Sequence, residues 1–241
     1  MKIIGVIPAR YKSSRFPGKP LALIKGKPMI QWVYERASLC ENIDELVVAT
    51  DDEMIYNTCQ ELNINVMMTG DQKTGADRVA EVASKTDGDI YLNIQGDEPL
   101  LDPRALDQII DYMKAHPEEE YVGLRSHIND EDMWGKPNCV KCVCTLDSYA
   151  MYFSRSPIPF NYHDDAVYRV MGFYGYKRQF LLDFLAYGQS ILEIKENGVE
   201  MLRAMEHGHR VKLIDTTYLT IGVDYPEHIA EVEAWMDKYE S

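Results

Sequence analysis

Short apolar runs alternate with segments of helical periodicity along the first half of the chain. The runs KIIGVIP, ELVVATDD, INVMMT and DIYLNIQGDEP contain many β-branched residues and predict buried strands. Between them, PMIQWVYERASLC, DEMIYNTCQELN and GADRVAEVASKT place apolar residues at helical spacing. A fourth helix is predicted in DPRALDQIIDYMKAH, with Asp102 as the N-cap and Pro103 at the first helical position.

This alternation predicts an α/β fold with a doubly wound, mostly parallel sheet and helices on both faces. After residue 120 the pattern is less regular. Longer strands are expected in NCVKCVCTLDSYAMYFSR, AVYRVMGFYGYK and RVKLIDTTYLTIGVD. Helices are expected in RQFLLDFLAY, in VEMLRAMEHG, which Gly208 would close, and in PEHIAEVEAWMDKYE. We expect a single domain, residues 1–241, with a smaller inserted flap within the region of about 121–215.

The composition narrows the classes of function. The chain has 241 residues, 46% of them hydrophobic and 27% charged, as in an ordinary globular protein. A net charge of −14 argues against general binding to nucleic acid or to an anionic membrane surface. No apolar run approaches the roughly 20 residues that span a bilayer, and the N-terminal run is too short for a signal peptide. Five cysteines without framework spacing predict reduced thiols and a cytoplasmic protein.

The loop after the first predicted strand is basic, although the chain as a whole is acidic. The segment ARYKSSRFPGK carries Arg10, Lys12, Arg15 and Lys19. Ligands of parallel sheets bind beyond the carboxyl ends of the strands, and main-chain N–H groups together with Arg and Lys suit a polyphosphate. A solvated basic surface loop is the alternative interpretation. Neither the Walker pattern nor the G-x-G-x-x-G fingerprint is present, so the loop belongs to neither class.

Aspartates follow two other predicted strands, at Asp97 in QGDEP and Asp224 in GVDYP. Mg²⁺ takes oxygen ligands and is usually held by one or two carboxylates plus substrate phosphates. Two aspartates on neighbouring strand ends would suit that ion. For each aspartate alone, a turn or a helix N-cap is the competing interpretation.

Several segments together resemble one known family. They are IPARYKSSRFPGKPLALIKGKPMIQWVYERA, VVATDDE, TGADR, NIQGDEPL, PNCVKCV, YAMYFSRSPIPF, GFYGYKRQFL and IGVDYPEH. In this order they resemble the CMP-Kdo synthetases, the 3-deoxy-manno-octulosonate cytidylyltransferases, and more distantly the CMP-sialic acid synthetases. The resemblance implies a Rossmann-like core, CTP as nucleotide donor, Mg²⁺ as cofactor, a homodimer and a role in lipopolysaccharide biosynthesis.

The resemblance also implies roles for individual residues. Arg10, Arg15, Lys19 and Asp97 are expected to act in catalysis, the three cations by stabilising the departing phosphates. Asp97 and Asp224 are expected to hold Mg²⁺. The nucleotide would contact a larger set: Pro8, Ala9, Arg10, Ser14, Arg15, Lys19, Thr74, Gly75, Arg78, Gln95 and Asp97. Thr74 also reads as a helix N-cap with Asp77 at the third helical position, a capping-box variant.

The acceptor sugar of this family carries a carboxylate, for which Arg155 in YFSRSPIP is the expected partner. The full acceptor set is Gln95, Ser154, Arg155, Tyr174 and Glu200, mostly within the region of about 121–215, which would also provide dimer contacts. Val170 stands where the family usually has His, and SILEIKENGVEMLR also departs from the family pattern. The nucleotide half therefore matches the family better than the acceptor half does.

The leading hypothesis is a Mg²⁺-dependent transferase that moves CMP from CTP to a Kdo-like 2-keto-3-deoxy sugar acid and releases pyrophosphate. One alternative keeps CTP and changes the acceptor to 8-amino-Kdo, a nonulosonic acid or a phosphonate. Another is an inactive homologue acting as a binding subunit, which should have lost Asp97, Asp224 or the basic loop. The expected partners are CTP, a small sugar acid and a second copy of the chain, with no nucleic acid and no membrane.

Overall fold

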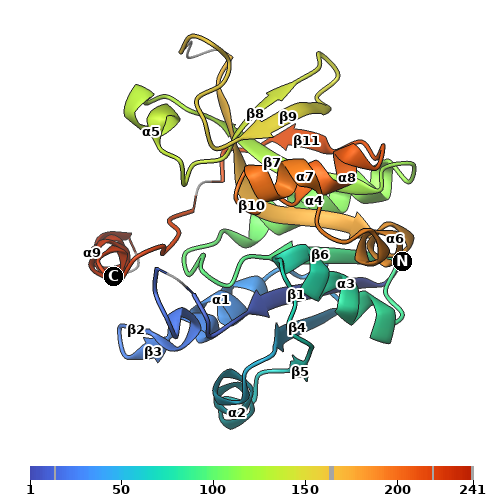
Figure 1. Cartoon of the computed structure of the whole chain (residues 1–241). Coiled ribbons are helices and arrows are strands. Elements are labelled where there is room, and N and C mark those ends of the chain that lie inside the picture. The colour runs from blue at the N-terminus through green and yellow to red at the C-terminus, as the bar shows by residue number, and fades with distance from the viewer. Residues whose placement is uncertain (14, 163–165, 219, 240–241) are drawn as a thin grey trace.

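The computed structural model describes residues 1–13, 15–162, 166–218 and 220–239. One large sheet runs through the molecule in the order β11-β7-β10-β6-β1-β4-β5 (Figure 1). The strands are β1 (Ile3–Ala9), β2 (Leu23–Ile24), β3 (Lys27–Pro28), β4 (Glu45–Thr50), β5 (Val66–Met68), β6 (Ile90–Ile94), β7 (Tyr121–His127), β8 (Lys141–Cys144), β9 (Ala150–Ser154), β10 (Tyr168–Lys177) and β11 (Lys212–Asp215). The helices are the 3-10 helix η1 (Lys19–Leu21), α1 (Met29–Ala37), α2 (Glu53–Glu61), α3 (Gly75–Lys85), α4 (Pro103–Ala115), α5 (Glu131–Gly135), α6 (Arg178–Tyr187), α7 (Ile191–Lys195), α8 (Met201–Glu206) and α9 (His228–Tyr239).

The sheet is mostly parallel, as the alternation of strands and helices predicts. β1 pairs in parallel with β4 and β6, β4 with β5, and β11 with β7. β10 runs antiparallel to both β6 and β7. The predicted α/β class is therefore confirmed, with β10 reversed between β6 and β7.

Helices cover both faces of this sheet, and β1 shows why. Ile3 and Ile7 pack into a core that includes residues of α1, α2 and α4. Ile4 and Val6, on the opposite face of the strand, pack into a core that includes residues of α3, α6 and α8. A strand buried on both faces needs apolar residues at consecutive positions, which explains the unbroken run KIIGVIP.

Part of the region of about 121–215 belongs to the central sheet, through β7, β10 and β11. Another part projects from it: β8 and β9 form an antiparallel hairpin, and α5 lies on the same side of the molecule (Figure 1). β8 joins the sheet through the first residues of β10, where Tyr168 pairs with Cys142. The role of this projecting part in acceptor binding and dimerisation stays a prediction.

The strand predicted in RVKLIDTTYLTIGVD ends at Asp215 in the structure, and the prediction is wrong for residues 216–218 and 220–224, while Leu219 lies outside the described residues. β11 pairs with β7 as far as the register Asp215–Arg125. The Thr216 hydroxyl then accepts a hydrogen bond from the Tyr218 N–H at 3.2 Å, which turns the chain out of the sheet. Residues 220–224 contain neither helix nor strand.

A third, smaller core holds this irregular segment in place. It contains Ile24 and Met29 near the start of α1, Leu100 after β6, Val223, and Val232 and Met236 from α9. The chain after β6 and the chain before α9 are thus packed together beside the N-terminal loop. Across the described ranges, no helix is long and apolar enough to cross a membrane.

Gly175 of β10 lies where the sheet packs tightly against α4, with no space for a larger side chain. A Cβ at this position would lie 2.5 Å from Met113 Sδ and 2.6 Å from Ile109 Cγ2 of α4. Gly175→Ala should therefore lower the free energy of unfolding by about 1–3 kcal/mol, because α4 must move from the sheet. Urea denaturation measures this change. Gly135→Ala is the matched control, since a Cβ there meets nothing within 4 Å; equal losses in both variants would contradict the prediction.

Candidate active site

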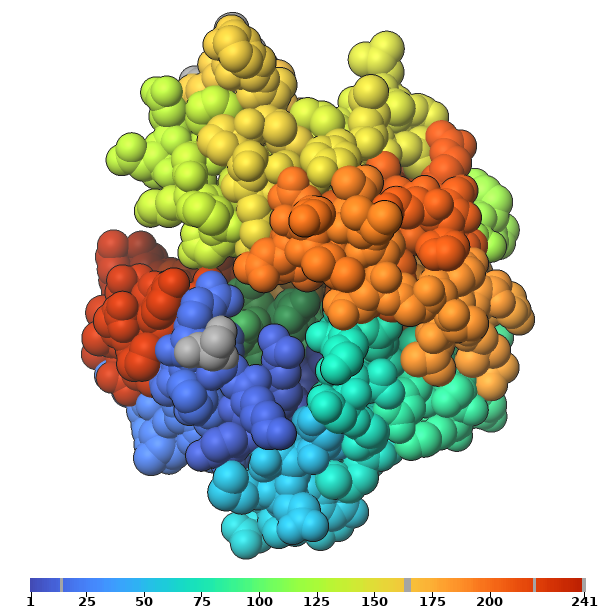
Figure 2. Space-filling model, in the orientation of Figure 1, coloured from blue at the N-terminus to red at the C-terminus, as the bar shows by residue number. Residues whose placement is uncertain are grey.

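A hollow opens at the carboxyl ends of β1 and β6. In Figure 2 it lies between the blue N-terminal loop, the teal start of α3 and the orange segment of α7 and α8. The two strand ends approach closely, since a Cβ on Gly96 would lie 2.9 Å from the Pro8 carbonyl oxygen. Pro8 and Ala9 both lie at this end of β1. The Ala9 side chain is 3% exposed, so any contact of Ala9 with a nucleotide would use its main chain.

The basic loop after β1 is folded back on Tyr11. The Tyr11 carbonyl accepts hydrogen bonds from the N–H groups of Ser13 at 3.0 Å and Gly18 at 2.9 Å. Gly18 has φ +71°, and a Cβ there would crowd the Tyr11 ring at 3.1 Å, so glycine suits this turn. Arg10 and Lys12 are exposed. Ser14, predicted to bind the nucleotide, lies outside the described residues.

Lys19 joins this loop to the chain after β6. Its Nζ lies 2.5 Å from Asp97 Oδ2 and also donates to the Val223 carbonyl at 2.8 Å. The Val223 N–H in turn donates to the Asp97 carbonyl at 2.9 Å. Lys19 therefore ties Asp97 to the segment that carries Asp224.

Arg15 makes the second ion pair of the loop. Its NH2 lies 2.9 Å from Asp224 Oδ1, and its guanidinium lies 5.6 Å from the centre of the Tyr225 ring. The Asp224 N–H donates to His228 Nδ1 at 3.1 Å. Asp224 was expected at a strand end, and this is wrong: it stands in the irregular segment after β11. Two contacts of the neighbouring Val223 hold Asp224 at this position: the hydrogen bond from the Val223 N–H to the Asp97 carbonyl, and the packing of the Val223 side chain in the third core.

The two aspartates fit a Mg²⁺ ion. Both offer carboxylate oxygens, and the backbone bond between Val223 and Asp97 brings their segments together. Among the described residues, no group of three or more His, Cys, Asp or Glu side chains is placed to hold a metal. Mg²⁺ does not need a complete set of protein ligands, because the ion keeps several waters and takes substrate phosphates as further ligands.

Glu98 is a site residue that the sequence analysis missed. Its Oε2 atom is buried without a hydrogen-bond partner, and its Oε1 would lie 3.2 Å from a Cβ on Gly222. Burial and then the charge of Asp97 raise the pKa of Glu98 to about 7, although Thr220 and Arg169 oppose the shift. Its position directly after Asp97 in QGDEP was the available signal.

The start of α3 forms another wall of the hollow. The capping box predicted there is confirmed: the Thr74 hydroxyl accepts from the Asp77 N–H at 3.1 Å, and Asp77 Oδ2 accepts from the Thr74 N–H at 3.1 Å. A Cβ on Gly75 would lie 3.5 Å from both Pro8 and Asn93. Asn93, also missed, is buried in β6 with both amide atoms lacking a hydrogen-bond partner. Most buried polar groups have a hydrogen-bond partner, so this amide is free to receive one from a bound molecule or a water.

Arg78 and Arg10 lie near each other on this side. Arg78 is 3% exposed, and its guanidinium donates to the Thr69 hydroxyl, to the Gly70 carbonyl at 3.2 Å and to Asp51 at 3.1 Å. Burial lowers the pKa of Arg78, and the positive charge of Arg10 adds to this effect. Contact of Arg78 with a base stays a prediction, and the contacts seen here anchor α3 to the ends of β4 and β5.

Gln95 and Tyr174 both lie at an irregularity in β10. The pairing of β10 with β7 shifts register between Val170 and Tyr174. A Cβ on Gly172 would lie 2.6 Å from Gln95 Cγ, so the Gln95 side chain passes directly over this glycine. Tyr174 is 6% exposed and packs edge-on against Tyr121, with ring centres 5.8 Å apart. Bulges of this kind often stand beside active sites, where they re-aim side chains.

Ser154 and Arg155 are both held by Glu196, which follows α7. Glu196 Oε1 accepts from the Ser154 hydroxyl at 3.0 Å, and Oε2 accepts from the Arg155 N–H at 2.7 Å. The Arg155 guanidinium donates to the carbonyls of Glu196, Pro137 and Asn197 at 2.9, 2.9 and 3.3 Å. Burial and then the charge of Arg15 lower the pKa of Arg155, which places the two cations at the same end of the site.

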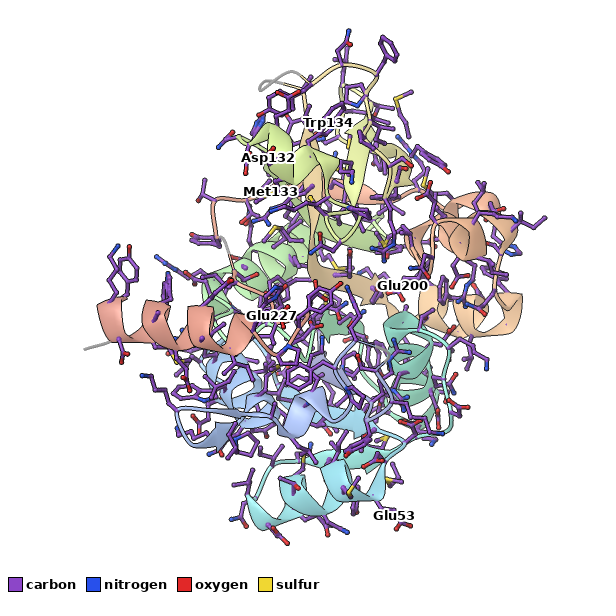
Figure 3. The ribbon with its side chains drawn as sticks, turned by 60° about the vertical axis from the view of Figure 1, so that its left-hand side comes forward. Glu53, Asp132, Met133, Trp134, Glu200 and Glu227 are labelled. Carbon is purple, nitrogen blue, oxygen red and sulfur yellow. The ribbon has the colours of Figure 1, made fainter. Side chains whose placement is uncertain are left out.

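Glu200 connects the acceptor side to α3. In Figure 3 it lies where the segment before α8 meets the start of α3. Glu200 is 8% exposed, and its Oε2 accepts from the Ala76 N–H at 3.4 Å. Burial raises the pKa of Glu200 to about 7, and the Ala76 N–H opposes this shift. The structure thus brings predicted acceptor and nucleotide residues to one place.

Comparisons with known proteins find cytidylyltransferases that are similar to this chain along most of its length. A family model described as cytidylyltransferase matches residues 4–213. The chain is 42% identical to a 3-deoxy-manno-octulosonate cytidylyltransferase of Geobacter sulfurreducens, covering 96% of this chain and 98% of that protein. It is 43% identical to an 8-amino-3,8-dideoxy-manno-octulosonate cytidylyltransferase of Shewanella amazonensis, covering 97% and 98%. A solved structure of CMP:2-keto-3-deoxy-manno-octonic acid synthetase complexed with CTP matches with a TM-score of 0.91 and 38% identity, covering 99% of both chains.

The buried Glu200 predicts a pH dependence of stability. Its pKa of about 7 in the folded chain lies above its ordinary value of 4.5, so between these pH values the folded chain keeps a proton that the unfolded chain has lost. Through this residue, the free energy of unfolding should fall between about pH 5 and about pH 7.5 by roughly 1–3 kcal/mol. Glu200→Gln stays neutral and should lose the contribution of this residue, while the similar contribution of Glu98 remains, as urea denaturation at the two pH values would measure.

Glu53, exposed at the start of α2 (Figure 3), provides the control for this experiment. Glu53→Gln should keep the pH dependence of the wild-type protein. If Glu200→Gln kept it as well, Glu200 would not retain its proton in the folded chain.

Proposed function

The chain belongs to the cytidylyltransferase family, among the CMP-Kdo synthetases, and from this premise we propose that it transfers CMP from CTP to 3-deoxy-manno-octulosonate (Kdo), with Mg²⁺ as cofactor. One observation carries the proposal. Lys19 and Arg15 of the basic loop are paired with Asp97 and Asp224, so the cations suited to a triphosphate lie beside the carboxylates suited to its metal.

CTP would bind with its phosphates against the basic loop. Arg10, Arg15 and Lys19 supply positive charge there, and charge-assisted hydrogen bonds to phosphate are among the strongest in proteins. The ion pairs of Arg15 and Lys19 with the aspartates hold these cations ready without substrate. The base would lie against the main chain of Pro8 and Ala9 and the start of α3, close to the buried amide of Asn93.

The reaction would be a single in-line displacement. A Kdo hydroxyl gives up its proton to solvent while its oxygen forms a bond to the α-phosphorus of CTP. The bond from that phosphorus to the oxygen that bridges the α- and β-phosphates breaks, and pyrophosphate leaves. Lys19 and Arg15 would stabilise the charge that develops on the pyrophosphate. Mg²⁺ held by Asp97 and Asp224 would supply neutralisation of phosphate charge and a lower pKa for the attacking hydroxyl.

The acceptor would lie between β10, the β8–β9 hairpin and α8. Arg155 is the proposed partner of its carboxylate, since a guanidinium presents several donors in one plane. Gln95, Ser154, Tyr174 and Glu200 would surround the sugar. We also propose that the enzyme acts as a cytoplasmic homodimer and that its product serves lipopolysaccharide biosynthesis.

A second acceptor is favoured by two specific observations. The relative from Shewanella amazonensis, at 43% identity, is named for 8-amino-3,8-dideoxy-manno-octulosonate. Val170, at the start of the β10 irregularity, replaces the His expected in Kdo enzymes by a side chain without a hydrogen-bonding group. 8-Amino-Kdo is therefore the alternative to Kdo.

The acceptor assignment is tested by pyrophosphate release with CTP and Mg²⁺ against Kdo, 8-amino-Kdo, sialic acid and small phosphonates. Release with Kdo at the highest kcat/KM is the expected result. A higher kcat/KM with 8-amino-Kdo would make 8-amino-Kdo the acceptor in place of Kdo. Release with only another acid would reject both acceptors and keep only the assignment of CTP as donor. Without release from any acid, calorimetric CTP binding would identify an inactive homologue that still binds nucleotide.

Asp97→Asn should abolish turnover, by at least about 100-fold in kcat, because the amide weakens the metal site and the pair with Lys19. The protein should keep its fold, as circular dichroism and thermal denaturation would show. Asp111→Asn, an exposed change in α4, is the matched control and should keep wild-type activity. Activity in Asp97→Asn close to that of the control would remove Asp97 from the metal role.

A further inference from the structure

A buried ionic network crosses the site from one substrate side to the other. At its centre is Arg203 of α8, which is 1% exposed. Its NH1 and NH2 lie 2.5 and 3.2 Å from the two carboxylate oxygens of Asp77. Its Nε and NH2 lie 2.8 and 2.7 Å from the two oxygens of Glu193. Neither Arg203 nor Glu193 was identified as a site residue from the sequence.

Each acid of this network closes a helix capping box. Asp77 closes the box with Thr74 at the start of α3. Glu193 closes the box with Ser190 at the start of α7, donating its N–H to the Ser190 hydroxyl at 3.4 Å. Arg203 therefore fixes the starts of two helices relative to each other. Phe184 lies beneath the guanidinium, 4.2 Å from its carbon to the ring centre, and completes the enclosure.

The two helices belong to different substrate sides. The start of α3 presents Thr74 and Gly75, the proposed nucleotide contacts. The end of α7 presents Glu196, whose carboxylate holds Ser154 and the Arg155 N–H. The residue before α8 also reaches the nucleotide side, because Glu200 accepts the Ala76 N–H.

Such a network gains little stability, which suggests another role. Three buried ionised groups are costly to desolvate, and apolar replacements of similar size are often as stable. What the network does provide is a fixed geometry, since the planar guanidinium makes two bidentate pairs at set angles. The start of α7 is thereby tied to the start of α3 through Glu193, Arg203 and Asp77.

We propose that Arg203 is a positioning residue that couples binding of the sugar acid to binding of the nucleotide, an inference that rests on the proposed function for the identity of the two sides. Acceptor binding at Arg155 and Ser154 orders Glu196 and α7. Through Glu193, Arg203 and Asp77, this order holds Thr74 and Gly75 in the arrangement that receives CTP. By linkage, CTP must tighten acceptor binding by the same factor.

The test is a matrix of initial rates at varied CTP and acceptor, which gives the dissociation constant of CTP from the free enzyme and its KM at saturating acceptor. In the wild type, the ratio of the two constants should be at least about 5, the lower end of typical coupling. Glu193→Gln keeps the shape of the side chain, contacts neither substrate, and should bring the ratio towards 1. Arg203→Lys should also lower it, because an ammonium cannot make both bidentate pairs.

Asp215→Asn is the matched control, since it too removes a carboxylate from a buried arginine, Arg125, at 2.8 Å. It should lower the thermal stability while keeping the wild-type ratio. A wild-type ratio close to 1 would overturn the proposal, and so would an unchanged ratio in both Glu193→Gln and Arg203→Lys. If one variant does not fold, the other decides.

The inference can fail separately from the proposed function. Wild-type turnover with unchanged coupling in the variants would reject only the role of Arg203. Absence of wild-type turnover with every acid would reject the proposed function. Calorimetric titration of the wild type and Glu193→Gln with CTP, each with and without saturating Kdo, would then test the network alone. Tightening of CTP binding by Kdo of at least about 5-fold in the wild type, lost in Glu193→Gln, would support transmission from α7 to the nucleotide side. No tightening in the wild type, or equal tightening in both proteins, would reject it.

Discussion

The ion pairs Lys19–Asp97 and Arg15–Asp224 join three segments that are far apart in the sequence. Each pair places a cation of an acidic chain against a carboxylate at the open end of the sheet. Such pairs gain little as surface salt bridges, but here one backbone bond, from the Val223 N–H to the Asp97 carbonyl, holds their geometry. The positive charge of the first loop is therefore positioned before any substrate arrives.

The sequence predicted the parts of this arrangement that depend on local order. KIIGVIP and DIYLNI had to be strands buried on both faces, and the loops after them had to lie at one edge. The N-caps Asp102 and Thr74 followed from spacing alone, and both accept the hydrogen bonds expected of them. The basic loop and Asp97 were found for the same reason, since each directly follows a predicted strand.

The remaining features depend on contacts between distant segments, which periodicity does not encode. The apolar and β-branched residues of LTIGV looked like a strand, yet Val223 uses its side chain in the third core and its N–H on Asp97. Glu196 lies in SILEIKENGVEMLR, where the sequence assigned it no role, but its carboxylate holds Ser154 and Arg155 at the end of β9. Arg203 lies in a segment with a helical pattern, and only the folded structure shows that Asp77 and Glu193 are its partners.

Different kinds of structure hold the proposed nucleotide half and the proposed acceptor half of the site. The nucleotide half stands on strand ends and a helix start, whose positions follow from the buried sheet. The proposed acceptor half stands on a hairpin, short helices and the irregular stretch of β10 from Val170, joined by side-chain hydrogen bonds. The two halves still have to meet within one reaction, and the fully buried guanidinium of Arg203 supplies a rigid joint between them.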